Sequence, residues 1–385
     1  MLLIRDYGVA GWWAFAIPNV VGAAALAWVI RSKGHSEQLV QAHRPAIRLF
    51  SIVTLAFHVF FIRWIMLSLI SMPAASPWAK SIGNDVFCLW PAVVILPFLL
   101  IYFAFRGRAD RWVAAGVLLI SLLIAWIGFR ELRLQLYNQF YYGWPPQYGV
   151  PSSISLAPTD LPYLAAVMVF GFLLCPYLDQ TFHRARQRSI HPRPAFALGF
   201  GVFFAAMIVM TLGYSHWLYN YFISLDNSAL PSIWGLGMGL LVYIHLLMQS
   251  GITMELHLRD MTRPDGHELK IPAAIWLALA YAGGIFASLA NPDGEGTYRI
   301  FMGFYALIFP AYVLICMQPW RKVTAAPGVR QWAFFAGAVL LAGPLFLMGI
   351  TGENRMPMFC GLLFVLVLAA AERVLPAIAM RNASR

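Results

Sequence analysis

The chain has 385 residues, of which 61% are hydrophobic and 11% are charged, and its formal net charge is +11. A soluble domain contains about a quarter charged residues, so this composition excludes a sizeable soluble domain and indicates an all-α polytopic membrane protein. The excess positive charge lies in short clusters between apolar stretches, which is typical of cytoplasmic loops and predicts no nucleic-acid partner.

Eleven apolar stretches are long enough to cross a lipid bilayer, which takes roughly 20 residues in a helix. In chain order we expect spans at about 9–30, 45–71, 84–105, 110–130, 160–183, 194–222, 231–257, 271–290, 298–318, 330–350 and 356–379. The chain then divides into N-terminal membrane helices (1–130, spans 1–4), a loop rich in aromatic residues and proline (131–159), and C-terminal membrane helices (160–385, spans 5–11).

Arginine and lysine gather at alternate gaps between these spans. The clusters lie at residues 31–48, 106–111, 184–193, 259–270 and 321–330. Cytoplasmic loops carry an excess of positive charge in membrane proteins. The pattern therefore predicts a multi-pass protein of the inner (cytoplasmic) membrane, with its N-terminus outside and its C-terminus in the cytoplasm.

The loop 131–159 falls on the outer side and has two possible roles. Its tyrosines, tryptophan and prolines suit an aromatic belt at the membrane surface, and they equally suit a docking surface or a lid over a site.

A short repeat points to internal duplication. The tripeptide Arg-Pro-Ala begins at Arg44, where span 2 opens, and at Arg193, where span 6 opens. Spans 1–4 and 5–8 would then be two four-helix bundles in the same orientation, followed by extra helices.

Three ionisable side chains fall deep inside expected spans, where a charge is costly and marks a functional site by default. His58 and His245 lie near the middle of spans 2 and 7, and Arg63 lies further along span 2. A histidine in a membrane can hydrogen-bond a neighbouring helix, or it can move protons and bind a quinone carbonyl. As a facing pair, two histidines can also ligate a haem. All three roles stay open here.

A second group lies at the outer end of span 6, next to the long outer loop. A quinol needs an aromatic slot with a few polar groups that hydrogen-bond its oxygens and accept its protons. We predict as catalytic residues His216, Asp226, His58 and His245, and as quinone-binding residues Tyr219, Tyr221, Trp217 and Arg63. Four further groups are expected at the inner interface, paired with Arg184, Arg259 or Arg263: Asp179, His183, Glu255 and Asp260.

The sequence has no signature of a resident metal or of a covalently bound cofactor. The cysteines form no CxxC pair and no cluster with histidine, so we expect Cys88, Cys175, Cys316 and Cys360 to pack as small apolar side chains. The sequence also has no HExxH, Walker or GxSxG motif. Redox centres would have to come from partner subunits.

A series of motifs from span 6 to span 9 resembles a known family. They are Ile223-Ser-Leu-Asp226, then Gly235, then His267-Glu-Leu, then Trp276, then Ala290-Asn-Pro-Asp-Gly-Glu295-Gly-Thr-Tyr298, and finally Pro310 with Arg321-Lys322. Their order resembles the NrfD/polysulfide-reductase group of membrane subunits, and within it the second quinone-binding membrane subunit of alternative complex III. The resemblance covers about the last 230 residues.

The resemblance implies two four-helix bundles and assembly with other membrane and periplasmic redox subunits. On this basis we expect an integral membrane subunit of a quinol-linked electron-transfer complex. It would contribute a quinone pocket or a proton path near the outer face, with quinone or quinol as an exchangeable ligand.

Two other functions stay open. The chain would be a secondary transporter if Pro18 and Pro176 break their helices at a substrate site, with Ser250 and Thr253 as candidate sodium ligands. Residues 178–186 are also reminiscent of sodium/solute symporters, but such symporters need five core helices before this point and only four spans precede it. The third possibility is a structural or assembly subunit of the membrane.

Overall fold

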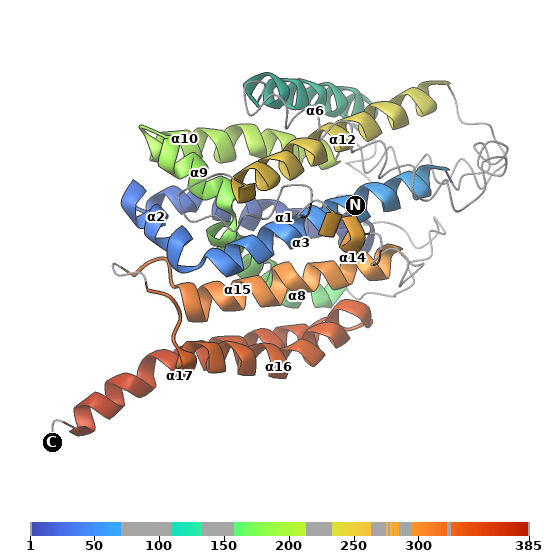
Figure 1. Cartoon of the computed structure of the whole chain (residues 1–385). Helices are drawn as coiled ribbons and strands as arrows, with labels where there is room; N and C mark the ends of the chain where they lie inside the picture. The colour runs from blue at the N-terminus through green and yellow to red at the C-terminus, as the bar shows by residue number, and fades with distance from the viewer. Residues whose placement is uncertain are drawn as a thin grey trace. The chain divides into compact units, whose positions relative to one another are not determined.

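A computed structural model describes residues 2–70, 110–132, 158–212, 233–262, 275, 278–279, 281–284, 286, 294–321 and 325–383. Within these residues every regular element is a helix, which confirms the expected all-α class (Figure 1). The long helices expose large apolar side chains such as Leu340 and Val367. These side chains indicate that the surroundings of the helices are lipid.

Seven of the described helices are long and apolar enough to cross a membrane, so the chain is a multi-pass membrane protein. They run over Asp6–Val29, Arg44–Ile65, Leu161–Leu178, Pro192–Leu212, Gly294–Met317, Val329–Thr351 and Met356–Leu375, and a shorter apolar helix covers Arg111–Ile127. The expected span at 84–105 lies outside the described residues. The count of eleven spans, their arrangement in two bundles and the orientation of the termini stay predictions.

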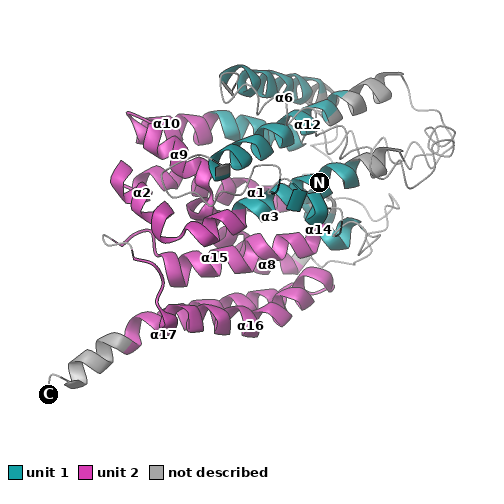
Figure 2. Ribbon diagram, in the orientation of Figure 1, with its two compact units in different colours: residues 1–8, 51–150, 203–297 teal, residues 9–50, 151–202, 298–385 magenta. Residues whose placement is uncertain are grey.

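The chain divides into two compact units, each assembled from segments that are far apart in the sequence (Figure 2). Unit 1 comprises residues 1–8, 51–150 and 203–297, and unit 2 comprises residues 9–50, 151–202 and 298–385. Residues 133–157 of the outer loop lie outside the described residues. The division into 1–130, 131–159 and 160–385 follows the order of the chain and stays a prediction.

Unit 1 is built around α12 (Ile233–Thr262), a helix of 30 residues. It packs on α6 (Asp110–Leu132) through a core that contains Ile124, Ala125, Met210 and Val242. It also packs on residues 51–70 of α3 (Arg44–Ile70) through a core that contains Leu55, Val59, Ile62, Met254, Leu258 and Met261. α12 therefore has a neighbour on two sides, and its polar residues must find partners on these neighbours.

Unit 2 contains the remaining helices. They are residues 9–29 of α1 (Leu2–Val29), α2 (Lys33–Ala42), η3 (Pro158–Asp160), α8 (Leu161–Leu174), η4 (Cys175–Leu178), α9 (Gln180–Arg188), α10 (Pro192–Leu198), the π-helical turns η6 (Phe304–Ile308) and η7 (Val313–Met317) on either side of α15 (Phe309–Tyr312), α16 (Val329–Thr351) and α17 (Met356–Ala383). Four of the described elements cross the boundary between the units, namely α1, α3, the π-helical turn η5 (Gly199–Phe204) and α14 (Gly294–Gly303).

The prolines at positions 18 and 176 have different effects on their helices. α1 continues through Pro18, and its non-helical backbone lies instead at Gly8, where φ is 62°. After α8 the chain tightens into the 3-10 turn η4, which contains Pro176, and Asp179 is extended before α9 begins. Proline lacks the N–H that an α-helix needs, and α8 ends at Leu174, two residues before Pro176.

Glycines let helix backbones of unit 2 approach one another closely. A Cβ on Gly22 of α1 would collide with the carbonyl group of Phe172 in α8, and one on Gly171 would lie 2.7 Å from the carbonyl oxygen of Tyr305 in η6. Helices in membranes associate through such close backbone contacts, because lipid offers no hydrophobic driving force between them. α8 therefore packs tightly on both neighbours.

α16 and α17 form a helical hairpin whose turn is held by arginine. The guanidinium of Arg355, which is 3% exposed, donates hydrogen bonds to the carbonyl oxygens of Gly349, Ile350 (3.0 Å) and Gly352 (3.2 Å). Arg299 donates to Ile350 as well, at 3.3 Å. The last carbonyls of a helix have no partner inside it, and a cation is favoured there.

A hydrogen-bond network joins α2 to α9. The Ser36 hydroxyl lies 2.9 Å from His183 Nδ1 and 3.0 Å from the Gln187 amide nitrogen, and His183 Nε2 lies 2.9 Å from the carbonyl oxygen of Tyr177. A carbonyl can only accept, so Nε2 carries the proton and Nδ1 accepts from Ser36. The described partners of His183 are thus Ser36 and the Tyr177 carbonyl rather than the expected arginine, and its ring is buried against α2, while its position at the membrane interface stays a prediction.

The α2–α9 network predicts that the folded chain loses stability at acidic pH. His183 lies beyond the Leu161–Leu178 span, and burial lowers its pKa from 6.5 to about 4. The unfolded chain therefore binds more protons than the folded one, so stabilisation is complete above about pH 6.5 and is lost as pH falls toward 4. We expect the unfolding temperature in detergent to drop through this window, and His183→Gln to flatten the drop, since glutamine can make the same bonds without titrating.

The control for this experiment is His191→Gln. His191 is exposed at the start of α10, so its replacement should keep the wild-type pH profile. Identical profiles for His183→Gln and wild type would contradict the assignment of the acid sensitivity to His183.

The hairpin of unit 2 predicts opposite effects for two alanine substitutions in α16. A Cβ on Gly349 would lie 2.5 Å from Met358 Cβ and 2.7 Å from its backbone nitrogen, whereas a Cβ on Gly337 meets no atom within 4 Å. Gly349→Ala should lower stability by about 1–3 kcal/mol through overpacking. Gly337→Ala should raise it by about 0.5–1 kcal/mol through helix propensity. Thermal unfolding of both variants in detergent measures the difference, and equal shifts would refute the close contact.

Candidate functional site

The candidate site lies on one face of α12 and contains four polar residues at intervals of four positions. We call them the polar ridge: His245, Gln249, Thr253 and His257. Side chains four residues apart lie on one helix face at successive turns. At 1.5 Å per residue, His245 lies about 18 Å from the start of α12, and His257 lies about 18 Å further on. α12 covers the span predicted at 231–257 but is not among the seven candidate membrane helices.

His245 is fully buried at the end of the ridge nearest the start of α12. Its Nε2 lies 2.7 Å from the Ser121 hydroxyl of α6, and that hydroxyl donates its own proton to the Val117 carbonyl oxygen, also at 2.7 Å. Ser121 must then accept from His245, so Nε2 carries the ring proton. Nδ1 is left as a buried lone pair, with no hydrogen-bond partner within the described residues.

His257 is buried at the other end of the ridge. Its Nδ1 lies 3.1 Å from the Ser51 hydroxyl of α3. Between the two histidines, the Thr253 hydroxyl donates to the Gln249 carbonyl oxygen at 2.9 Å. Each end of the ridge is thus tied to a neighbouring helix through a serine, while the middle is tied to α12 itself.

The last turns of α12 carry buried charges beside the ridge. Glu255 and Arg259 form an ion pair at 3.5 Å, with side chains 1% and 8% exposed, and Asp260 is buried as well. The predicted pairing of Glu255 with Arg259 is confirmed, but both side chains are buried rather than exposed at an interface. Burying such a pair is costly. With His245 and His257, the site places five ionisable groups within about four turns of helix.

The structure places three of the predicted site residues. His58 Nδ1 donates to the Thr54 carbonyl oxygen of its own helix at 2.7 Å, and Arg63 is buried further along α3. His58 and His245 therefore take different hydrogen-bond partners. The other predicted residues lie outside the described part of the chain, namely His216, Trp217, Tyr219, Tyr221 and Asp226.

His257 and both serines were not among the residues predicted from the sequence. The recurrence of polar residues at every fourth position of α12 is visible in the sequence and could have identified His257. Ser51 and Ser121 carry no such signal, because a serine in an apolar span is common and its partner is more than 100 residues away in the chain.

The arrangement suits proton transfer better than metal binding. No group of three or more histidine, cysteine or acidic residues is placed to hold a metal ion within the described residues. Imidazole, hydroxyl and amide groups at successive turns both donate and accept hydrogen bonds.

No family model matches this sequence, and no curated protein matches it significantly.

The His245–Ser121 bond predicts a measurable coupling between α6 and α12. Ser121→Ala leaves His245 Nε2–H without its acceptor, so we expect a destabilisation of about 1 kcal/mol, with a coupling of about 0.5–1.5 kcal/mol in a double-mutant cycle with His245→Phe. Thr253→Val is the matched control, because that hydroxyl bonds only the backbone of its own helix in the contacts described above. Additive effects of Ser121→Ala and His245→Phe would rule out the bond.

Proposed function

We propose that this chain is an integral membrane subunit of a quinol-linked electron-transfer complex, and that the polar ridge of α12 moves protons for it. The observation that carries the proposal is His245. The span predicted at 231–257 puts it near the middle of the membrane; one ring nitrogen is bonded to Ser121, and the other is buried without a partner among the described residues. An ionisable group at this depth marks a functional site by default.

The ridge has the composition of a relay. The imidazoles of His245 and His257 have nitrogens that can donate or accept a hydrogen bond, and Gln249 and Thr253 lie between them at one-turn intervals. The buried Glu255 lies about 15 Å along the helix from His245, on the face of α12 opposite the ridge. In the proposed relay, protons pass along the ridge between His257 and His245.

The quinone pocket in this proposal consists of the predicted group His216, Trp217, Tyr219, Tyr221 and Asp226, with electron carriers supplied by partner subunits.

The transporter alternative receives less support from the helix geometry. It requires a broken helix at Pro18, where α1 is continuous, and the break at Pro176 lies at the end of its span rather than at the middle.

The proposal separates quinone binding from proton transfer. Quinone-analogue binding to the purified chain can be followed by quenching of its tryptophan fluorescence, and His216→Ala should weaken this binding about tenfold by removing a hydrogen bond to the ligand. His245→Gln should leave binding unchanged, because glutamine can donate to Ser121. It should lower quinol oxidation by membranes at least tenfold, because glutamine cannot carry a proton.

The control is His191→Ala, which replaces an exposed histidine of unit 2 and should alter neither measurement. Absence of quinone-analogue binding at any accessible concentration would refute the quinol function. Full quinol oxidation by His245→Gln membranes would refute the relay while leaving the quinone pocket standing.

A further inference from the structure

The two histidines of the polar ridge are far apart for a proton relay. About 18 Å of helix separates His245 from His257. Gln249 and Thr253 lie between them and can donate and accept hydrogen bonds, but neither an amide nor a hydroxyl holds a proton as a charge. A third ionisable group within this interval would divide it, and the neighbouring helix α3 carries one in His58.

The polar ridge turns around α12 from one neighbouring helix to the other. A helical turn takes 3.6 residues, so each step of four residues rotates the side chain by about 40°. At one end His245 therefore contacts Ser121 of α6, and at the other end His257 contacts Ser51 of α3. The half of the ridge near His257 thus faces the side of α3 that bears Ser51.

His58 lies on the same side of α3 as Ser51. Seven residues separate the two, which is close to two full turns, so their side chains differ in direction by only about 20°. His58 lies about 10 Å further along α3 than the contact between Ser51 and His257. It falls within the apolar helix Arg44–Ile65, which is one of the candidate membrane spans.

α3 and α12 run in opposite directions within unit 1. His257 contacts Ser51, while Leu247, ten residues earlier in α12, packs against the core that contains Ile62, eleven residues after Ser51. A step from Ser51 to His58 along α3 is therefore a step from His257 toward His245 along α12. His58 lies about 10 Å from the level of His257 and about 8 Å from that of His245, so it divides the interval.

The hydrogen bond to Thr54 prepares the imidazole of His58 to accept a proton. Nδ1 lies 2.7 Å from the Thr54 carbonyl oxygen, which can only accept, so Nδ1 carries the ring proton and Nε2 a lone pair. Nε2 makes no hydrogen bond to a described residue, and the side chain is half-buried, so water can reach it. The rings of His58 and His257 also lie close enough to interact electrostatically.

We propose that His58 is a third proton-carrying residue of the relay, between His257 and His245. This inference rests on the proposed function. A proton that arrives at Nε2 converts the ring to imidazolium, while Nδ1–H stays bonded to the Thr54 carbonyl, and Nε2 then releases the proton toward the next group. On either side of His58, Gln249 and Thr253 bind the water that bridges the remaining distance.

The test measures quinol oxidation by membranes that contain His58 variants. Glutamine can donate to the Thr54 carbonyl as histidine does but cannot carry a proton, so His58→Gln should lower the rate about tenfold. It should also raise the solvent deuterium isotope effect, because proton transfer then limits the rate. Added imidazole should restore part of the rate of His58→Ala saturably, since a half-buried position admits a small ring. A merely structural role of His58 predicts neither the isotope effect nor the rescue.

The control is Phe57→Leu, which changes the ring that packs against the His58 imidazole at 5.6 Å between centroids. It should keep the wild-type rate and isotope effect. Binding of the quinone analogue should be unchanged in His58→Gln, which shows that the variant is folded.

The outcomes separate this inference from the proposed function. A full rate in His58→Gln membranes, together with slow oxidation by His245→Gln, would overturn the role of His58 and leave the ridge of α12 as the relay. Slow oxidation by His58→Gln with weakened binding of the quinone analogue, and no rescue of His58→Ala by imidazole, would assign His58 a structural role instead. Full rates in both glutamine variants, or no quinol oxidation by wild-type membranes, would overturn both proposals.

Discussion

The absence of water from the hydrocarbon core is the constraint on which this structure depends. Each backbone or side-chain polar group at membrane depth must find a partner inside the protein. Helices satisfy most of the backbone, and side chains satisfy the helix ends that remain, as Arg355 does for three carbonyls at the end of α16. The same constraint pairs His245 with Ser121 and His257 with Ser51, so the polar residues of α12 also determine which neighbours it takes.

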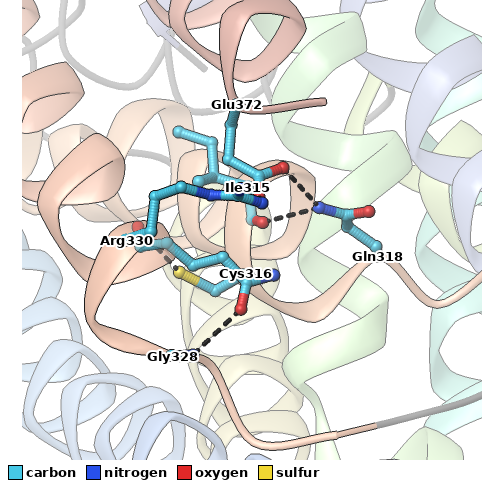
Figure 3. A network of polar contacts seen from close by, with 7 residues as sticks. Ile315, Cys316, Gln318, Gly328, Arg330 and Glu372 are labelled. Carbon is cyan, nitrogen blue, oxygen red and sulfur yellow. Dashed lines mark hydrogen bonds and ion pairs between the residues drawn. The ribbon is translucent and has the colours of Figure 1, made fainter. Parts of the chain in front are cut away.

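The buried charges contribute differently to stability from the serine–histidine hydrogen bonds. A buried ion pair contributes little net stability, because the desolvation of both groups offsets their attraction. Glu255 and Arg259 could be replaced by apolar side chains without loss on that account. In the pair of Arg330 and Glu372 only the glutamate is buried, because the arginine side chain is 52% exposed. The Gln318 amide donates to the second carboxylate oxygen of Glu372 at 3.3 Å, so this network joins the end of η7 to α16 and α17 (Figure 3).

The membrane class and the positions of most described helices could be predicted from the sequence, because hydropathy over about 20 residues depends only on local composition. His245 could also be identified as a candidate, since a histidine in an apolar run is visible without a structure. The role of His257, the burial of Glu255 and the partners of His183 were not. These depend on which helices pack together, and Ser51 lies 206 residues from His257 while Ser36 lies 147 residues from His183. No local pattern encodes such pairings.

A serine partner leaves His245 free to take either tautomer. A hydroxyl can donate or accept by rotating its O–H bond, so the contact between α6 and α12 can persist whichever ring nitrogen of His245 is protonated. A carboxylate partner would instead favour the imidazolium and hold its proton. The hydrogen bond that joins these two helices is therefore compatible with the proton transfer that we propose for His245.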